Sequence, residues 1–261
     1  MNDEKSVDKL ASENEQLRQE ILNLKRKLNR EEKQDTIANV TKLLSMKNER
    51  LENAYTELED VTERLRKSYQ QTIAYYLNTV RAMVSVLESK SSYFIHHSMR
   101  VSRYARGIGK ELELSKVDIE KLGIAGMLHD FGNIGIKEEL FQKPEKLSSQ
   151  EYETVKKHPL NAELILEPIG NLSDVIDDIR HHHEHFDGTG YPDGLNGETI
   201  PLRSRILAVA ETFDSLTSDR PYRRKVGMEK ALQEIREHTG TQFDPSVVQA
   251  FERFIENDSL S

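Results

Sequence analysis

The first 72 residues contain neither Gly nor Pro, and their apolar residues follow one another at steps of three and four. This spacing forms the a/d seam of a coiled coil, because it places one apolar edge along a helix. A second run keeps a sevenfold period but is out of phase with the first, so we expect the helix to break or change register near residues 30–35. The first run comprises Val7, Leu10, Asn14, Leu17, Ile21, Leu24 and Leu28, and the second comprises Ile37, Leu44, Leu51, Leu58 and Leu65.

Asn14 falls at an a position of this seam. A buried amide there favours a parallel dimer in one register. We therefore expect residues 1–72 to form a segment for homodimerisation and signalling. The alternative is a long solvated helix that packs on its own domain.

Composition narrows the class of protein further. The chain of 261 residues has no Cys and 9 His, so a metal would have to be held by nitrogen and oxygen. The charged N-terminus does not fit a secretory signal, and no apolar run is long enough for a membrane span. The net charge of -8 argues against binding to a nucleic-acid polymer. We expect a cytoplasmic protein.

From about residue 73 onward the apolar residues follow helical faces, which predicts a globular all-α domain over residues 73–261. The segment 205–210 (RILAVA) could be a short buried strand, but its apolar spacing continues helically to residue 213, so we interpret it as helix. The Gly- and Pro-rich segment 187–201 is too rich in turns for regular structure. After the apolar face at residues 75–87, further helices are expected at 93–112, 117–129, 149–166, 174–183, 205–217, 228–238 and 245–255.

Several histidines fall on buried faces of these predicted helices. His97 shares a face with apolar residues of its helix, whereas His96 is turned away. His182 and His183 continue the apolar stripe of the helix before them, and His181 falls on a different face. Two adjacent buried imidazoles need polar partners, which a metal supplies. A single inward histidine can equally be a hydrogen-bonded core residue.

Other candidate ligands lie at helix ends or beside these faces. His129 and Asp130 end a helix next to a glycine turn, and His158 ends a helix before Pro159. Glu211 and Asp214 lie three residues apart, and their alternative role is a helix N-cap or an ion pair with Arg205. Together these side chains predict two transition-metal ions, Fe, Mn, Zn or Ni rather than Mg or Ca, with Asp130 as the bridging carboxylate.

The order of these residues resembles the HD-GYP subgroup of the HD superfamily of metal-dependent phosphohydrolases. The resemblance covers about residues 87–255. It is carried by HSMRV (97–101), HDFGNIGI (129–136), KHPLNAELIL (157–166), HHHEHFDGTGYPDGLNGETIP (181–201) and RSRILAVAETFDSLTSDRPYR (203–223).

The resemblance implies hydrolysis of cyclic di-GMP to pGpG, and in some members to GMP, by water that two bridged Fe or Mn ions activate. The metal ligands that it implies are His97, His129, Asp130, His158, His182, His183 and Glu211. Some members bind a third metal through a Glu four residues before the first histidine. Tyr93 occupies that position here, so two metals are expected.

This chain departs from the family pattern at two positions. Asn133 replaces a Lys that is thought to contact a substrate phosphate, and Glu211 replaces an Asp. Asn133 can hydrogen-bond a phosphate oxygen but supplies no charge. Arg220 and Arg223 then become the expected phosphate contacts, unless they pair with Asp219 or Glu198.

Three further sets of roles follow from the resemblance. Gly190, Tyr191 and Pro192 are expected in a substrate-binding loop, with Gly188, that also offers a surface to partner proteins. Asp214 is expected to orient a ligand or a basic residue rather than to bind metal. The residues expected to act in catalysis are His129, Asp130, Asn133 and Asp214.

Two functions remain open on the sequence. One is a cyclic di-GMP phosphodiesterase that dimerises through its N-terminal helices and receives its input from a sensor or response-regulator partner. The other is a catalytically weak cyclic-dinucleotide receptor or scaffold, with a site weakened at Asn133 and Glu211. Hydrolysis of linear pGpG or cyclic GMP-AMP is a variant of the first.

Overall fold

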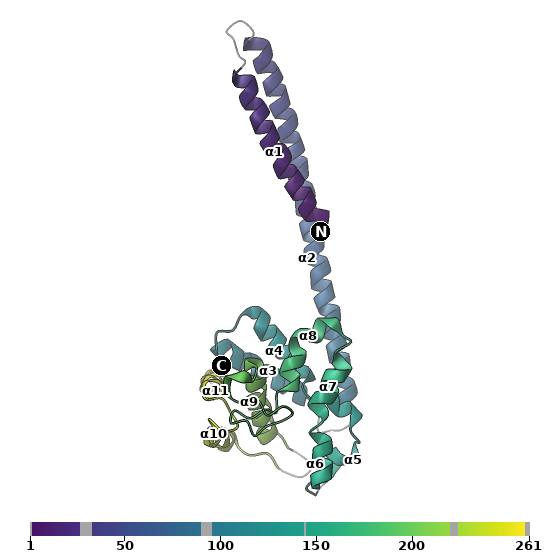
Figure 1. The fold of residues 1–261 in the computed structure, drawn as a ribbon, viewed down its shortest axis with the longest axis vertical. Coiled ribbons are helices and arrows are strands. Elements are labelled where there is room, and N and C mark those ends of the chain that lie inside the picture. Colours follow the sequence, from purple (N-terminus) through teal and green to yellow (C-terminus); the bar gives the residue numbers. More distant parts are fainter. Residues whose placement is uncertain (1, 27–32, 90–95, 144, 220–223, 259–261) are drawn as a thin grey trace. The chain divides into compact units, whose positions relative to one another are not determined.

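The computed structural model describes residues 2–26, 33–89, 96–143, 145–219 and 224–258. The chain divides into two compact units, residues 1–73 and residues 74–261 (Figure 1). Within the described residues no helix has the length and apolarity that a membrane span requires.

The first unit is built from helices. Helix α1 spans Asn2–Arg26, and α2 begins at Lys33 and continues to Glu88, so that its last turns belong to the second unit. Part of the expected break, residues 30–32, lies outside the described residues. The second apolar run lies along α2 and stays exposed: Ile37, Leu44, Leu51, Leu58 and Leu65 keep 56, 44, 42, 50 and 68% of their surface.

The second unit is also helical, and no strand occurs in the part of the chain that the structure describes, which confirms the all-α prediction. Residues 205–210 lie inside a helix. The α-helices of this unit after α2 are α3 (His97–Glu111), α4 (Lys116–Leu128), α5 (Glu139–Gln142), α6 (Ser149–Val155), α7 (His158–Leu166), α8 (Ser173–Arg180), α9 (Leu202–Thr217), α10 (Met228–Glu237) and α11 (Pro245–Asp258). Among the described residues of this unit, the 3-10 turns are η2 (Phe131–Gly135), η3 (Gly170–Leu172) and η4 (Gly197–Thr199).

Two predicted helices differ from the observed ones. The segment 149–166 is divided between α6 and α7, because Pro159 lacks an amide hydrogen and is accommodated only in the first turn of a new helix. Helix α8 ends at Arg180, so the three histidines that follow lie in a turn and do not continue its apolar stripe. Helix α5 and the 3-10 turns were not predicted, because segments of three to five residues carry no periodic signal.

Helix α3 lies at the centre of the second unit and contacts α4, α9 and α11. Its apolar face is buried, and Tyr104 meets Phe213 of α9 edge to face at 5.1 Å. Two glycines permit close packing beside the histidines. A Cβ on Gly126 would lie 2.9 Å from Ser102 Cα, and one on Gly132 only 1.9 Å from the carbonyl oxygen of His158. These contacts bring α4 and η2 against α3 and α7.

Candidate metal centre

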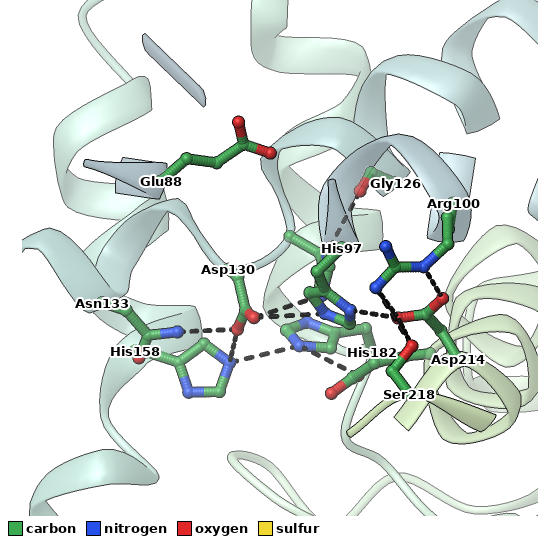
Figure 2. A network of polar contacts seen from close by, with 12 residues as sticks. Glu88, His97, Arg100, Gly126, Asp130, Asn133, His158, His182, Asp214 and Ser218 are labelled. Atoms are coloured by element: carbon green, nitrogen blue, oxygen red, sulfur yellow. Dashed lines mark hydrogen bonds and ion pairs between the residues drawn. The ribbon is translucent and has the colours of Figure 1, made fainter. Parts of the chain in front are cut away.

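Asp130, between α4 and η2, lies at the centre of a group of histidines (Figure 2). It is buried, and its Oδ2 atom lies 3.5 Å from the Nε2 atoms of both His97 and His129. Its Oδ1 atom lies 3.5 Å from Nε2 of His158. The two oxygens of one carboxylate therefore face two different sets of imidazoles, as bridging of two ions requires.

Three of the histidines share one local geometry: His129, His158 and His182. Each ring places Nδ1 at 2.9, 2.9 and 2.5 Å, respectively, from the backbone carbonyl three residues before it. Because a carbonyl oxygen only accepts, Nδ1 carries the proton and the Nε2 lone pair faces the cluster. A backbone contact thus selects the tautomer that binds metal.

The Nε2 atoms of these three rings are well placed to bind a cation, and they are poorly accommodated without one. The Nε2 atoms of His158 and His182 lie 3.2 Å apart, and with protons on Nδ1 their lone pairs oppose one another. Nε2 of His129 is buried and makes no hydrogen bond within the described residues. Divalent ions would satisfy all three atoms.

The candidate ligands separate into two triads. One ligand atom each from His158, His182 and His183 lies within 4.8 Å of the other two. The same holds for His97, His129 and Glu211. With Asp130 between them, the structure brings together all seven side chains that the sequence predicts as ligands.

Helix α9 supplies Glu211 from the middle of its length. Its Oε2 atom lies 3.8 Å from Nε2 of His182 and 4.0 Å from Nδ1 of His183. The alternative roles of Glu211 and Asp214 are wrong: α9 begins at Leu202, so neither is an N-cap, and Arg205 pairs with Asp244 instead.

Electrostatics keep two of the rings neutral. Burial lowers the pKa of His182 well below its usual value, and the neighbouring histidines lower it further. The pKa of His183 is lowered for the same reasons. Burial would raise the pKa of Asp130, but His129, His97 and His158 outweigh it and hold that pKa well below its usual range. A neutral His182 and a neutral His183 beside an ionised carboxylate have the protonation states that metal binding needs.

His97 is oriented by a carboxylate outside the cluster. Its Nδ1 atom donates to Asp214 Oδ2 at 2.7 Å, which leaves Nε2 toward Asp130 (Figure 2). Arg100 binds the same carboxylate through two nitrogens, at 2.5 and 3.0 Å. Burial lowers the pKa of His97, but hydrogen bonds to Asp130 and Asp214 prevail and raise it to about 9. Asp214 thus contacts both a ligand candidate and a basic residue.

Asn133 lies closer to the cluster than its expected substrate role suggests. Its Nδ2 atom donates to Asp130 Oδ1 at 2.7 Å, and the residue is buried. The amide therefore fixes the orientation of the central carboxylate. It also lines the cavity in front of the cluster.

The loop after α8 is held by residues that the ligand prediction did not include. Glu184 accepts hydrogen bonds from the backbone amides of residues 193, 194 and 195 at 2.7, 3.1 and 3.1 Å. His181 is buried but turns away from the cluster, with Nε2 at 2.9 Å from Asp193 Oδ2. His96 is exposed. Neither of these histidines belongs to the two triads.

The loop also reaches the cluster. A Cβ on Gly190 would lie 2.2 Å from the backbone nitrogen of His185, so only glycine fits there. The Tyr191 ring stacks on His183 with centroids 4.8 Å apart, and Lys156 Nζ lies 5.2 Å from the centre of the tyrosine ring. Pro192 follows through a cis peptide bond.

A cavity of about 750 Å³ opens in front of the cluster. Its lining includes Asp130, His158, His183, Tyr191 and Glu211. A cavity of this size accepts an organic ligand of several rings. The expected contacts Arg220 and Arg223, and the third-metal position Tyr93, lie outside the described residues.

Sequence reasoning missed Arg100 as a partner of Asp214. A signal was present, because Arg100 lies three residues after His97 and shares its helical face. The bond from Arg100 Nη2 to Ser218 Oγ at 3.1 Å also ties α3 to the end of α9. No local sequence signal pairs Glu184 with the backbone of a loop nine residues away.

Comparison with known proteins agrees with the arrangement of these residues. The family model described as HD domain matches residues 81–247. This chain belongs to the HD-domain family. Its resemblance to the HD-GYP group is confirmed by curated relatives that are named as cyclic-dinucleotide phosphodiesterases.

Two such relatives illustrate the range of named substrates. The 3'3'-cGAMP-specific phosphodiesterase 3 of Vibrio cholerae is 36% identical over 180 residues, covering 69% of this chain and 39% of the relative. The cyclic di-GMP phosphodiesterase response regulator RpfG of Xanthomonas campestris is 40% identical over 156 residues, covering 59% and 41%. This HD-domain chain thus spans less than half the length of either relative.

A solved HDG"Y"P protein of Bdellovibrio bacteriovorus has the same fold, with a TM-score of 0.53 at 20% identity. The alignment covers 70% of this chain and 60% of that one.

Proposed function

We propose that residues 73–261 form a metal-dependent phosphodiesterase domain that hydrolyses cyclic di-GMP to pGpG, and in a further step to GMP. The observation that carries the proposal is the placement of Asp130, whose two oxygens each lie 3.5 Å from a different set of histidine nitrogens. The relatives named as cyclic-dinucleotide phosphodiesterases support this choice of substrate class.

In this mechanism His97, His129 and Glu211 hold one ion, and His158, His182 and His183 hold the other. The bound ions, Fe or Mn in the first place and Zn or Ni otherwise, supply Lewis acidity to water and to the phosphoryl oxygens. Asp130 links the two sets of ligands. Asn133 and Asp214 fix the orientations of Asp130 and His97 through bonds of 2.7 Å each.

The rest of the cavity has to position the nucleotide. Tyr191 stacks beside His183 at the cavity wall and is proposed to contact the nucleotide. Gly190 lets the loop backbone approach residues 184 and 185 closely, and with Pro192 it is proposed to shape the loop that carries Tyr191. Arg220 and Arg223 complete the set of proposed phosphate contacts.

The first test is made on protein purified anaerobically with Fe or Mn. Bound metal is quantified per chain, and cyclic di-GMP and 3'3'-cGAMP are each followed by chromatography. Two ions per chain with pGpG as product is the expected result. Two ions with faster turnover of 3'3'-cGAMP would change the substrate but keep the mechanism, whereas a metal-free protein with full activity would exclude it.

A receptor or scaffold role is the second candidate, because Asn133 supplies no positive charge toward a phosphate and Glu211 reaches farther than the usual Asp. Tight binding of cyclic di-GMP without any product would identify a receptor. Reversion of both positions, Asn133→Lys with Glu211→Asp, is then expected to create hydrolysis.

We also propose that α2 pairs with a second copy of this chain through its exposed leucines. Their sevenfold period matches the seam of a coiled coil, and their exposed fractions show that the described residues of the same chain do not cover them. In this assembly residues 1–72 carry the signal from a sensor or response-regulator partner to the domain. A location in the cytoplasm is part of the proposal.

A further inference from the structure

A cyclic dinucleotide carries two phosphodiesters on opposite sides of one ring. If one of them binds at the metal ligands, the other lies away from them and retains its negative charge. A cavity that binds such a ligand tightly therefore needs a cation at a distance from the ions. Asn133, which lines the cavity, supplies none.

Two lysines line the cavity of the second unit: Lys143 and Lys146. Lys143 is already engaged, because its Nζ lies 3.0 Å from both carboxylate oxygens of Glu151. Lys146 is exposed, and within the described residues it makes no ion pair with a carboxylate. Its ammonium group is thus available to an anionic ligand.

The chain on both sides of Lys146 is fixed to the start of α6. Glu151 accepts from Lys143 Nζ and from the backbone nitrogen of Ser148 at 2.7 Å, and Ser148 caps the helix in return. The backbone bond from Ser148 and the ion pair with Lys143 lower the pKa of Glu151 to about 2, so these contacts persist at neutral pH. Residues 143 and 148 are therefore held in place, and Lys146 lies between them at the cavity wall.

The residues that line the cavity are of two chemical kinds. Asp130, His158, His183 and Glu211 line it where the metal ligands lie, whereas the segment around Lys146 contributes Leu147 and Tyr152. An aliphatic and aromatic surface beside an available ammonium group suits a nucleotide, because it offers contact to a base and charge to a phosphate. Glu145 also lines this part of the cavity, and its negative charge would repel an anion there.

We propose that Lys146 binds the phosphate that is not cleaved, in addition to the phosphate contacts proposed for Arg220 and Arg223. The inference rests on the proposed cyclic-dinucleotide function and deepens it by naming a residue that determines affinity for the second phosphate. Lys146 has no part in holding the metals, so its removal weakens binding and leaves the chemical step intact.

The test compares wild type with Lys146→Ala, Lys146→Arg and Lys137→Ala in the full chain loaded with Mn. Lys137 is an exposed lysine that does not line the cavity, so its removal changes net charge alone. For cyclic di-GMP, Lys146→Ala is expected to raise KM roughly tenfold, which corresponds to about 1.4 kcal/mol, with kcat nearly unchanged, because a charged hydrogen bond to the phosphate is lost. Lys146→Arg is expected to restore most of the affinity, and Lys137→Ala to change little.

Two further measurements separate a phosphate contact from a structural effect. Bis(p-nitrophenyl) phosphate has only one phosphodiester, so its hydrolysis should be unaffected by Lys146→Ala. Glu145→Gln should lower KM for cyclic di-GMP, opposite in sign to Lys146→Ala. An unchanged KM in Lys146→Ala, or equal losses with both substrates, overturns the inference.

Equilibrium binding of cyclic di-GMP, measured by calorimetry on the same variants, keeps the inference testable if turnover is absent. A roughly tenfold loss of affinity in Lys146→Ala, but not in Lys137→Ala, supports it in a receptor as well as in an enzyme. Equal affinities exclude it while leaving the metal centre untouched. If the wild-type protein neither binds nor cleaves cyclic dinucleotides, the proposed function itself has failed.

Discussion

In α2 the leucines of the sevenfold repeat keep 42 to 68% of their surface exposed, whereas Leu122, Leu128 and Leu166 of the second unit are fully buried. Both sets follow a helical period, but only the second is complemented by the described residues of the chain. A seam with a period of seven matches another helix of the same kind, while faces with a period of 3.6 match the several helices of a core.

The polar residues show the opposite contrast. In the first unit charged side chains pair on the surface, as Arg66 does with Glu63 at 2.8 Å. In the second unit His129 and His182 are fully buried, and their Nε2 atoms lie 3.5 Å from Asp130 and 3.8 Å from Glu211, respectively. The first unit thus has an apolar surface suited to a partner helix, whereas the second has a cluster suited to cations. Substitutions can remove each of these two features separately.

The largest effect is expected from His129→Ala combined with Asp130→Ala. This change removes the carboxylate proposed to bridge the ions and one imidazole, so bound metal should fall toward zero and hydrolysis should drop by about 10³-fold or more. Metal content and product formation are measured on the same preparation.

His238→Ala is the matched control, because His238 is an exposed histidine whose Nδ1 contacts a backbone carbonyl at 2.8 Å. The double variant should remain a dimer in sedimentation. Hydrolysis that survives in the double variant would exclude the two-metal mechanism.

The next effect concerns assembly. Deletion of residues 1–68 removes most of the exposed seam and should convert a dimer to a monomer in analytical ultracentrifugation, with metal content unchanged. Replacing Leu44, Leu51 and Leu58 by Glu in the full chain should have the same result, because like charges then face one another across the seam. A dimer that persists in both variants would place the interface in the globular unit.

The sequence was sufficient for the fold class because helical periodicity is local and strong over ten or more residues. It failed at the end of α8, where an apolar stripe suggested a helix through His183 but the helix ends at Arg180. His182 is nevertheless buried, held by a backbone contact to residue 179 that periodicity does not encode.

The candidate ligands could be named from the sequence largely because family motifs include them. The contacts that orient these side chains could be predicted less well. Asp214 was expected to orient a neighbour, but the sequence did not specify that it contacts both His97 and Arg100. For Asn133 the sequence indicated a role in catalysis and in substrate binding, but not that its amide bonds to Asp130. Such pairings depend on how distant helices pack, which no local pattern contains.

A smaller effect is expected from Asp214→Asn, which keeps the shape of the side chain but removes its charge. His97 then loses its ionised partner, and loss of such a partner typically lowers metal affinity or activity 10- to 100-fold. Titration with Mn and the dependence of kcat on Mn concentration measure the change. Asp174→Asn on α8 is the control, as an exposed Asp outside the cluster. An unaltered Mn affinity and kcat would show that Asp214 acts only on packing.

The smallest effect is expected from Asp178, a buried carboxyl group that is not among the candidate metal ligands. Burial raises the pKa of Asp178 to about 6, despite its ion pair with Arg203 at 2.6 Å. The unfolded chain ionises near 3.8, so between pH 3.8 and 6 the folded protein binds more protons. The free energy of unfolding should therefore fall as the pH rises through this window.

The expected fall is on the order of 1 to 3 kcal/mol, because one pKa unit corresponds to about 1.4 kcal/mol. Asp178→Asn should flatten the curve, since the amide does not titrate, and Asp174→Asn should not. Urea unfolding with a chelator present, followed between pH 4 and 7, measures the slope without a contribution from metal release. Equal slopes in wild type and Asp178→Asn would show that Asp178 ionises in the folded protein as it does in water.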